Sequence, residues 1–307
     1  MSKIAFLCPG YGSEVVGMGV DFVGRTAWGA DYFEEVKAIS GLDIFEVCMN
    51  GPQDELSQTQ NAQPALAATS VAIARALRER GVEPSCVAGI AEGEYAAHII
   101  AGTIDMGSAF ELVARRGALA AMAAHINGGK TAELLGCTRA QAEDLCSAFG
   151  GKIAVCAELS PVRTAVSGDT DALEAAVAQW RDGKGSAKVY DGSFAANGKL
   201  MRSVATGMGM ALKNTLFGPG DIPVYCNLTG ECFDHMRSPE LLGEQLVSPV
   251  LWRQSVEAML EDGVDVFVQC GPGTTALDAA KETAETLGAE ARFIKVATAE
   301  DVMFAKL

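Results

Sequence analysis

Histidine and basic side chains are scarce in this chain of 307 residues. It holds 3 histidines, and its 24 Lys and Arg residues are outnumbered by 39 Asp and Glu residues, which gives a formal net charge of −15 at pH 7. Nucleic acids and anionic membrane surfaces both attract basic patches. We therefore expect no nucleic acid partner and no membrane partner.

Clustered cysteines are also missing. The 9 cysteines are scattered singly, no C-x-x-C pair occurs, and no histidine stands at ligand spacing. A zinc site is therefore not expected, and the sequence indicates neither a metal nor a cofactor. Unpaired cysteines are typical of a reducing compartment. Because the first residues are too poor in apolar side chains for a signal-peptide core, and no run approaches a membrane span, the sequence predicts a cytoplasmic protein.

Apolar residues make up 49% of the chain, enough for one large domain with a smaller one. A continuous apolar run at Ile4–Cys8 and stretches rich in apolar residues at 82–88 and 264–270 predict buried strands, and helical patterns separate them. Strands that alternate with helices indicate an α/β fold with a mostly parallel sheet that is covered on both faces.

The middle of the chain follows a different order. Residues 128–196 predict a β-α-β-β-α-β series, which is the ferredoxin-like signature. We therefore predict a main α/β domain made of residues 1–127 and 197–307. A small ferredoxin-like subdomain, residues 128–196, is inserted in it.

The sequence Gly89-Ile90-Ala91-Glu92-Gly93 has the spacing of a nucleophile elbow. In the G-x-S-x-G motif a serine stands on a sharp turn between a strand and a helix, and the flanking glycines allow the chains to approach closely. An apolar run precedes this segment and a helical pattern follows it, as the motif requires. The serine position holds Ala91, which carries no nucleophilic atom. The sequence thus predicts the scaffold of a covalent catalyst without its reactive atom.

Eight short segments, in this order along nearly the whole chain, resemble malonyl-CoA:acyl carrier protein transacylases and the acyltransferase domains of polyketide synthases. They are Pro9-Gly10-Tyr11-Gly12-Ser13, Gly51-Pro52-Gln53-Asp54-Glu55-Leu56, Gln63-Pro64-Ala65-Leu66, Gly93-Glu94-Tyr95, Arg116-Gly117, Asn227-Leu228-Thr229-Gly230, Ser248-Pro249-Val250 with Trp252, and Gly271-Pro272-Gly273. The resemblance implies a hydrolase-like α/β domain with a ferredoxin-like insertion.

The same resemblance implies a chemistry. In that family a Ser–His pair moves a malonyl group from coenzyme A to a carrier-protein thiol through an acyl-serine, and two backbone N–H groups hold the oxyanion. The family elbow reads Gly-His-Ser-Leu-Gly, so Ala91 stands at the nucleophile position and Ile90 replaces the preceding histidine. An ungapped match before Leu200 places Asn197 at the position of the catalytic histidine. Asparagine cannot act as a base near neutral pH, so no catalytic residue is expected to be intact.

Substrate-binding positions are partly kept. The resemblance assigns Arg116 to the malonyl carboxylate and Gln63 to the wall of the site, whereas Tyr11 stands where the family has glutamine and Glu92 where it has leucine. Ala157 and Leu159 likewise replace asparagines. Because a buried guanidinium without a counter-charge is costly, we predict that Glu92 contacts Arg116, directly or through one water, in the place of the substrate carboxylate. A plainer interpretation of Arg116 is a helix arginine that is neutralised by a neighbouring carboxylate.

Three functions from different classes are compatible with these residues. The first is a non-catalytic transacylase homologue that binds acyl carrier protein or synthase subunits in fatty-acid or polyketide biosynthesis. The second is an active acyltransferase or thioesterase on acyl-CoA or acyl carrier protein that uses another nucleophile, either Glu92 or a cysteine such as Cys8, Cys86 or Cys270. The third is a small-molecule sensor that reuses the pocket. His98, on the helix after the elbow, is interpreted as a packing or surface residue.

Overall fold

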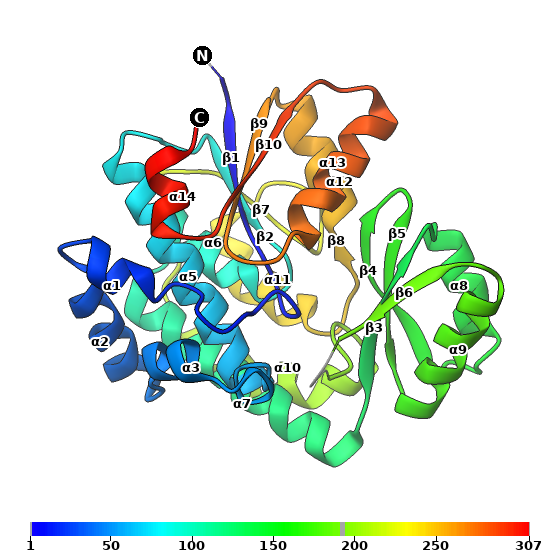
Figure 1. Cartoon of the computed structure of the whole chain (residues 1–307). Coiled ribbons are helices and arrows are strands. Elements are labelled where there is room, and N and C mark those ends of the chain that lie inside the picture. The colour runs from blue at the N-terminus through cyan, green and yellow to red at the C-terminus, as the bar shows by residue number, and fades with distance from the viewer. Residues whose placement is uncertain (1, 191–193, 307) are drawn as a thin grey trace.

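One of the two five-stranded sheets is parallel throughout and carries the elbow. The computed structural model describes residues 2–190 and 194–306; Met1, residues 191–193 and Leu307, which the predicted domains include, lie outside the described residues. In the described part this sheet has the strand order β10-β9-β1-β2-β7 (Figure 1). Its strands are β1 (Ile4–Cys8), β2 (Cys86–Gly89), β7 (Val224–Tyr225), β9 (Val266–Cys270) and β10 (Arg292–Val296). The three predicted strands therefore lie side by side in one sheet, as expected, while β10 was not predicted.

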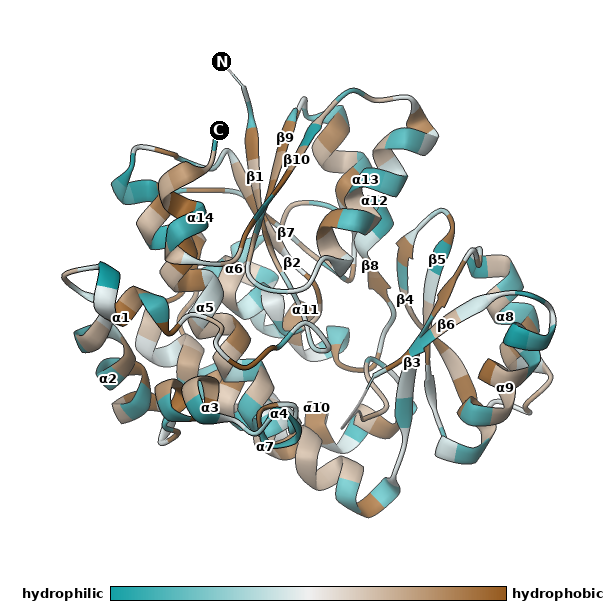
Figure 2. Cartoon of the chain, viewed as in Figure 1, coloured by the Kyte–Doolittle hydropathy of each residue, from teal (hydrophilic) through white to brown (hydrophobic). Residues whose placement is uncertain are grey.

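Helices cover both faces of this sheet because its central strand is apolar on both sides. Along β1, Phe6 and Cys8 join one hydrophobic core, whereas Ala5 and Leu7 join another, as the alternation of side chains in a strand dictates. In Figure 2, β1 and β9 are coloured as hydrophobic along most of their length. This double burial explains why every residue of β1 is apolar.

The helices divide between these two cores. On the Phe6 side lie α1 (Asp21–Arg25), α2 (Gly29–Ser40), α3 (Ile44–Asn50), α4 (Gln53–Leu56), α5 (Thr59–Glu79), α6 (Gly93–Ala101), α7 (Met106–Asn127), α10 (Arg202–Asn214), α11 (Ser238–Gln245) and α14 (Ala299–Phe304). On the Leu7 side lie α12 (Trp252–Glu261) and α13 (Thr275–Leu287). Short 3₁₀ turns occupy Lys199–Met201 and His235–Arg237. No helix in residues 2–190 and 194–306 is long and apolar enough to cross a membrane.

The second sheet forms a separate lobe (Figure 1). It is called the small sheet below, because most of its strands belong to the small subdomain. The lobe is built from β3 (Lys130–Leu135), α8 (Arg139–Ser147), β4 (Ile153–Ser160), β5 (Arg163–Gly168), α9 (Thr170–Asp182) and β6 (Ser186–Val189), which is the predicted β-α-β-β-α-β order. The sheet order β6-β3-β5-β4 is antiparallel, and the short strand β8 (Val250–Leu251) adds to β4 in parallel. The boundaries at 127/128 and 196/197 remain predictions.

One helix begins earlier than its local sequence predicts. Proline is common at the first position of a helix, so Pro64 and the apolar pattern after it predict a helix start there. The structure differs, because α5 begins at Thr59 and contains Pro64 in its interior. Proline removes one backbone hydrogen bond from a helix and normally disfavours this position. Nearly every residue from Ala62 to Leu77 is buried, so the packing of α5 in the core outweighs the lost bond.

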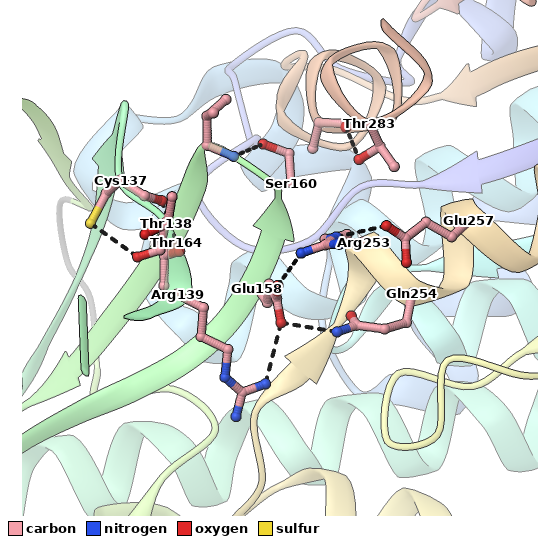
Figure 3. A network of polar contacts seen from close by, with 12 residues as sticks. Cys137, Thr138, Arg139, Glu158, Ser160, Thr164, Arg253, Gln254, Glu257 and Thr283 are labelled. Atoms are coloured by element: carbon pink, nitrogen blue, oxygen red, sulfur yellow. Dashed lines mark hydrogen bonds and ion pairs between the residues drawn. The ribbon is translucent and has the colours of Figure 1, made fainter. Parts of the chain in front are cut away.

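Two ion networks hold the small sheet against α12 and α13. Glu158 of β4 is almost fully buried and accepts hydrogen bonds from Arg253 Nη1 at 3.1 Å and Gln254 Nε2 at 2.9 Å, both on α12 (Figure 3). Arg163 of β5 donates to Glu282 of α13 and, at 2.7 Å, to Glu133 of β3. Between the inner face of this sheet and the elbow lies a cleft.

Candidate functional site

The elbow backbone has the strained conformation that the motif requires. Ala91 has a φ of +51°, a left-handed conformation that costs free energy for any residue with a Cβ. A Cβ at Gly89 would lie 2.0 Å from the carbonyl carbon of Gly93, and one at Gly93 would lie 2.6 Å from the oxygen of Cys8. Both glycines are therefore needed for close approach, and β2 turns sharply into α6 with Ala91 at the apex.

Two side chains from distant parts of the chain hold the apex in place. The Ala91 N–H donates to Asn227 Oδ1 at 2.6 Å, and the Ala91 carbonyl accepts from Gln245 Nε2 at 2.8 Å. Asn227 Nδ2 also donates to the Gly89 carbonyl at 2.6 Å. Such bonds over-determine a strained residue and keep it in its unusual conformation.

A buried carboxyl group completes this support. Glu94 Oε1 accepts from the Asn227 N–H at 2.5 Å, and Glu94 Oε2 accepts from Gln245 Nε2 at 2.6 Å. Burial raises the pKa of Glu94 to about 8, because desolvation disfavours the charged form. Sequence reasoning missed the roles of Asn227, Gln245 and Glu94. The one available signal was that Asn227 and Glu94 both lie in segments that carry the family resemblance.

Asn197 lies at the same site. It is buried, has a φ of +48°, and its Nδ2 donates to the Gln245 carbonyl at 2.8 Å. Asn197 and Ala91 both line the cleft between the elbow and the small sheet, and Gln245 contacts each of them. The structure thus brings together the two positions that the resemblance assigned to the catalytic pair, and neither side chain can act as nucleophile or base.

The predicted contact between Glu92 and Arg116 is confirmed. Arg116 Nη1 lies 3.2 Å from Glu92 Oε2, and the two side chains are 1% and 2% exposed. The same Nη1 donates to Gln63 Oε1 at 2.6 Å, and the other carboxylate oxygen of Glu92 accepts from the Tyr11 N–H. The four residues that the sequence singled out for substrate binding therefore form one hydrogen-bonded group.

Only one nitrogen of the arginine is satisfied by these bonds. Nε and Nη2 of Arg116 are buried and have no hydrogen-bond partner among the residues that the structure describes. Arg116 does not line the cleft, whereas Glu92 does. A carboxylate that entered from the cleft would therefore reach the guanidinium only if Glu92 moved aside.

Cys8, Cys86 and Cys270, the three cysteines considered from the sequence, do not have the environment of a nucleophile. Cys8, Cys86 and Cys270 are buried in strands, and desolvation raises the pKa of all three thiols, to about 12 for Cys86. A thiolate is the reactive form, so these thiols are suited to packing instead. The carboxylate of Glu92 has both oxygens occupied by the contacts described above. These observations weigh against a relocated nucleophile at either kind of residue.

His98 is a packed core residue. It is 1% exposed, its Nδ1 lies 2.7 Å from Thr103 Oγ1, and its ring contacts Phe217 and Phe233 at angles near the edge-to-face arrangement. Burial lowers its pKa to about 3, so the imidazole stays neutral. The interpretation of His98 as a packing residue is confirmed. Within residues 2–190 and 194–306, no group of three or more His, Cys, Asp and Glu side chains could hold a metal ion.

Comparison with known proteins gives one consistent family. The model of the acyl transferase domain matches residues 5–302. The chain is 32% identical over 298 residues to the malonyl CoA-acyl carrier protein transacylase of Escherichia coli (strain K12), covering 95% of this chain and 96% of that protein. It is 30% identical over 278 residues to the transacylase of the same name in Bacillus subtilis (strain 168), covering 89% and 88%.

Solved structures agree with the sequence relatives. The malonyl CoA-acyl carrier protein transacylase of Coxiella burnetii superposes with a TM-score of 0.90 at 26% identity, covering 98% of this chain and 96% of that one. A malonyl-transacylase solved in complex with its type II PKS acyl-carrier protein superposes with a TM-score of 0.88 at 28% identity, covering 98% of both chains. The hydrolase-like α/β fold with a ferredoxin-like subdomain is therefore shared with these solved transacylases.

Proposed function

The chain belongs to the acyl transferase domain family, and on that premise we propose that it is a catalytically silent homologue of malonyl-CoA:acyl carrier protein transacylases. In this proposal it takes part in fatty-acid or polyketide biosynthesis as a binding or assembly partner of an acyl carrier protein or a synthase. The chemistry of acyl transfer is absent from its site, while the frame that surrounds the site is kept.

The observation that carries the proposal is an intact elbow with an inert residue at its apex. Hydrogen bonds from Asn227 and Gln245 still hold Ala91 at its strained φ. The fold therefore keeps a backbone conformation that costs free energy and that directs the side chain at the apex into the site. That side chain is a methyl group. Asn197, at the position assigned to the base, donates its amide to a backbone carbonyl and cannot accept a proton near neutral pH. Members of such a catalytic unit act together, so the loss of both should leave essentially no turnover.

Glu92 supports the same proposal from the substrate side. Its carboxylate contacts Arg116, which the resemblance assigns to the malonyl carboxylate, and it also accepts from the Tyr11 N–H beside the elbow. Oxyanion holes at nucleophile elbows use a loop N–H of this kind. We therefore propose that Glu92 is an internal substitute for the substrate carboxylate. It would weaken malonyl binding in addition to the missing chemistry.

The experiment combines an adduct measurement with a binding measurement. The purified protein is incubated with malonyl-CoA or acetyl-CoA and weighed by intact-protein mass spectrometry, and a holo acyl carrier protein from the same genome is titrated in a separate calorimetric cell. We expect no acyl adduct, no transfer to the carrier-protein thiol, and a measurable dissociation constant for the carrier protein. A stable adduct or transfer above background would overturn the catalytic silence, and a carrier protein that does not bind would overturn the partner role.

A further inference from the structure

We infer that the cleft at the elbow binds an uncharged, apolar acyl chain carried on a pantetheine thioester, in preference to a malonyl group. This inference rests on the proposed function and names the ligand class of the same site. It follows from three properties of the cleft, which are its charge, its polar groups and its apolar wall.

The charge of the cleft disfavours an acyl group that carries a carboxylate. None of the described residues that line it is a lysine, arginine or histidine, and its one charged lining residue is Glu92. The guanidinium that could neutralise a carboxylate, Arg116, is buried behind Glu92 and paired with it. A malonyl carboxylate would have to lose its water, approach a like charge and find no free counter-charge at the wall, and each of these steps is unfavourable.

Most polar side chains that line the cleft already have partners within the protein. The Tyr11 hydroxyl donates to the Ser57 carbonyl at 2.8 Å, and the Tyr190 hydroxyl donates to Glu133 Oε2 at 2.9 Å. The Thr131 hydroxyl donates to the Phe194 carbonyl at 2.6 Å. The aromatic rings of Tyr11 and Tyr190 are left as apolar surface on this wall, and they meet at an interplanar angle of 76°.

Apolar side chains supply the remaining wall. The elbow contributes Ile90 and Ala91, β4 contributes Ala157 and Leu159, β5 contributes Ala165, and β8 contributes Val250. Two of these, Ala157 and Leu159, stand where the family resemblance places asparagines. The cleft encloses about 580 Å³ of empty space when its open mouth is included.

The test on the unmodified protein is a titration series in a calorimeter. The ligands are coenzyme A, malonyl-CoA, butyryl-CoA, hexanoyl-CoA and octanoyl-CoA, all at one pH and salt concentration. We expect affinity to rise from butyryl to octanoyl by about fourfold for each methylene that is buried, and malonyl-CoA to bind at least tenfold more weakly than octanoyl-CoA. Equal affinity for coenzyme A and octanoyl-CoA, or tighter binding of malonyl-CoA, would overturn the inference.

A pair of variants on one strand locates the site. Ala157→Phe fills the cleft from β4, whereas Ala154→Phe adds the same ring at an exposed position of the same strand. We expect Ala157→Phe to weaken octanoyl-CoA binding at least tenfold, and Ala154→Phe to leave it within twofold. Thermal unfolding of each variant shows whether it is folded; if Ala157→Phe unfolds, Ala165→Leu replaces it. Unchanged binding in a folded cleft variant would overturn the inference.

Failure of this inference is distinguishable from failure of the proposed function. If a carrier protein binds but octanoyl-CoA does not bind more tightly than coenzyme A, the partner role stands and the acyl site is wrong. If octanoyl-CoA binds in the cleft and malonyl-CoA acylates the protein, the acyl site stands and the catalytic silence is wrong.

Discussion

Replacing Glu92 by leucine should destabilise the protein by about 3–5 kcal/mol, because the change leaves the Arg116 guanidinium buried without a counter-charge. The pair is 1% and 2% exposed, so solvent cannot take over the role of the missing carboxylate. The change also removes the acceptor that the carboxylate offers to the Tyr11 N–H, which adds to the cost. Leucine is the family residue at this position in the resemblance, so its shape is compatible with the fold.

The second half of the experiment removes the arginine too. In the double variant Glu92→Leu, Arg116→Met no charge is left buried, and apolar replacement of buried ion pairs is often neutral or stabilising. We expect the double variant to regain about 2–3 kcal/mol relative to the sum of the two single changes, which is the coupling energy of the pair. Gln63 loses its donor in this variant, so full recovery is not expected.

The assay is urea unfolding at equilibrium, followed by circular dichroism for the wild type, both single variants and the double variant. An exposed pair serves as the matched control: Lys281 and Glu285 lie 3.8 Å apart, one turn apart on α13, and are 58% and 66% exposed. Glu285→Leu should change the free energy of unfolding by less than about 1 kcal/mol. If Glu92→Leu costs no more than Glu285→Leu, or the coupling energy is below about 0.5 kcal/mol, the buried ion pair does not have the role described above.

Three further results are expected. Ala91→Ser alone should give no malonyl transfer above background in a carrier-protein assay, because Asn197 cannot take the serine proton; transfer by that variant would reveal another base. Glu158→Ala should lower the free energy of unfolding by about 1–3 kcal/mol in urea, since it strips a buried acceptor from its donors on α12, whereas Glu174→Ala at an exposed ion pair should cost less than about 1 kcal/mol; equal costs would refute the role of the network. The pKa of Glu94 is about 8 in the folded protein against 4.5 ordinarily, so the folded state binds more protons at this group, and its contribution to stability should fall as pH rises from about 5 to 8. The buried His98, whose pKa is about 3 against 6.5 ordinarily, contributes in the opposite direction up to about pH 6.5, so the net fall should appear between about pH 6.5 and 8. Glu94→Gln should reduce this fall in pH-dependent unfolding, and an unchanged slope would contradict the assignment.

The strands and their grouping were predictable because they rest on local patterns. Ile4–Cys8 is buried on both faces, so every residue of it is apolar, and only a strand at the centre of a covered sheet tolerates that pattern. The ferredoxin-like lobe was predictable from the order of its elements. The elbow was predictable from Gly89 and Gly93. At both positions the neighbouring backbone lies too close to leave room for a Cβ atom, so only glycine fits. The Glu92–Arg116 contact followed from the cost of an unpaired buried charge.

Other features depend on contacts that no local pattern records. Asn227 lies 136 residues from Ala91 in the chain and Gln245 lies 154 residues away, yet their amide groups hold the apex of the elbow. The start of α5 before Pro64 was decided by burial of the helix, against the local preference of proline. Tertiary contacts also decided β8. Its two residues form a strand because they pair with the edge of β4. The residues of this chain determined by themselves which segments are buried and which side chains are absent from the apex. Tertiary structure alone decided which distant polar groups satisfy one another, because a hydrogen bond requires its partners to meet within about 3 Å and sequence separation does not constrain that distance.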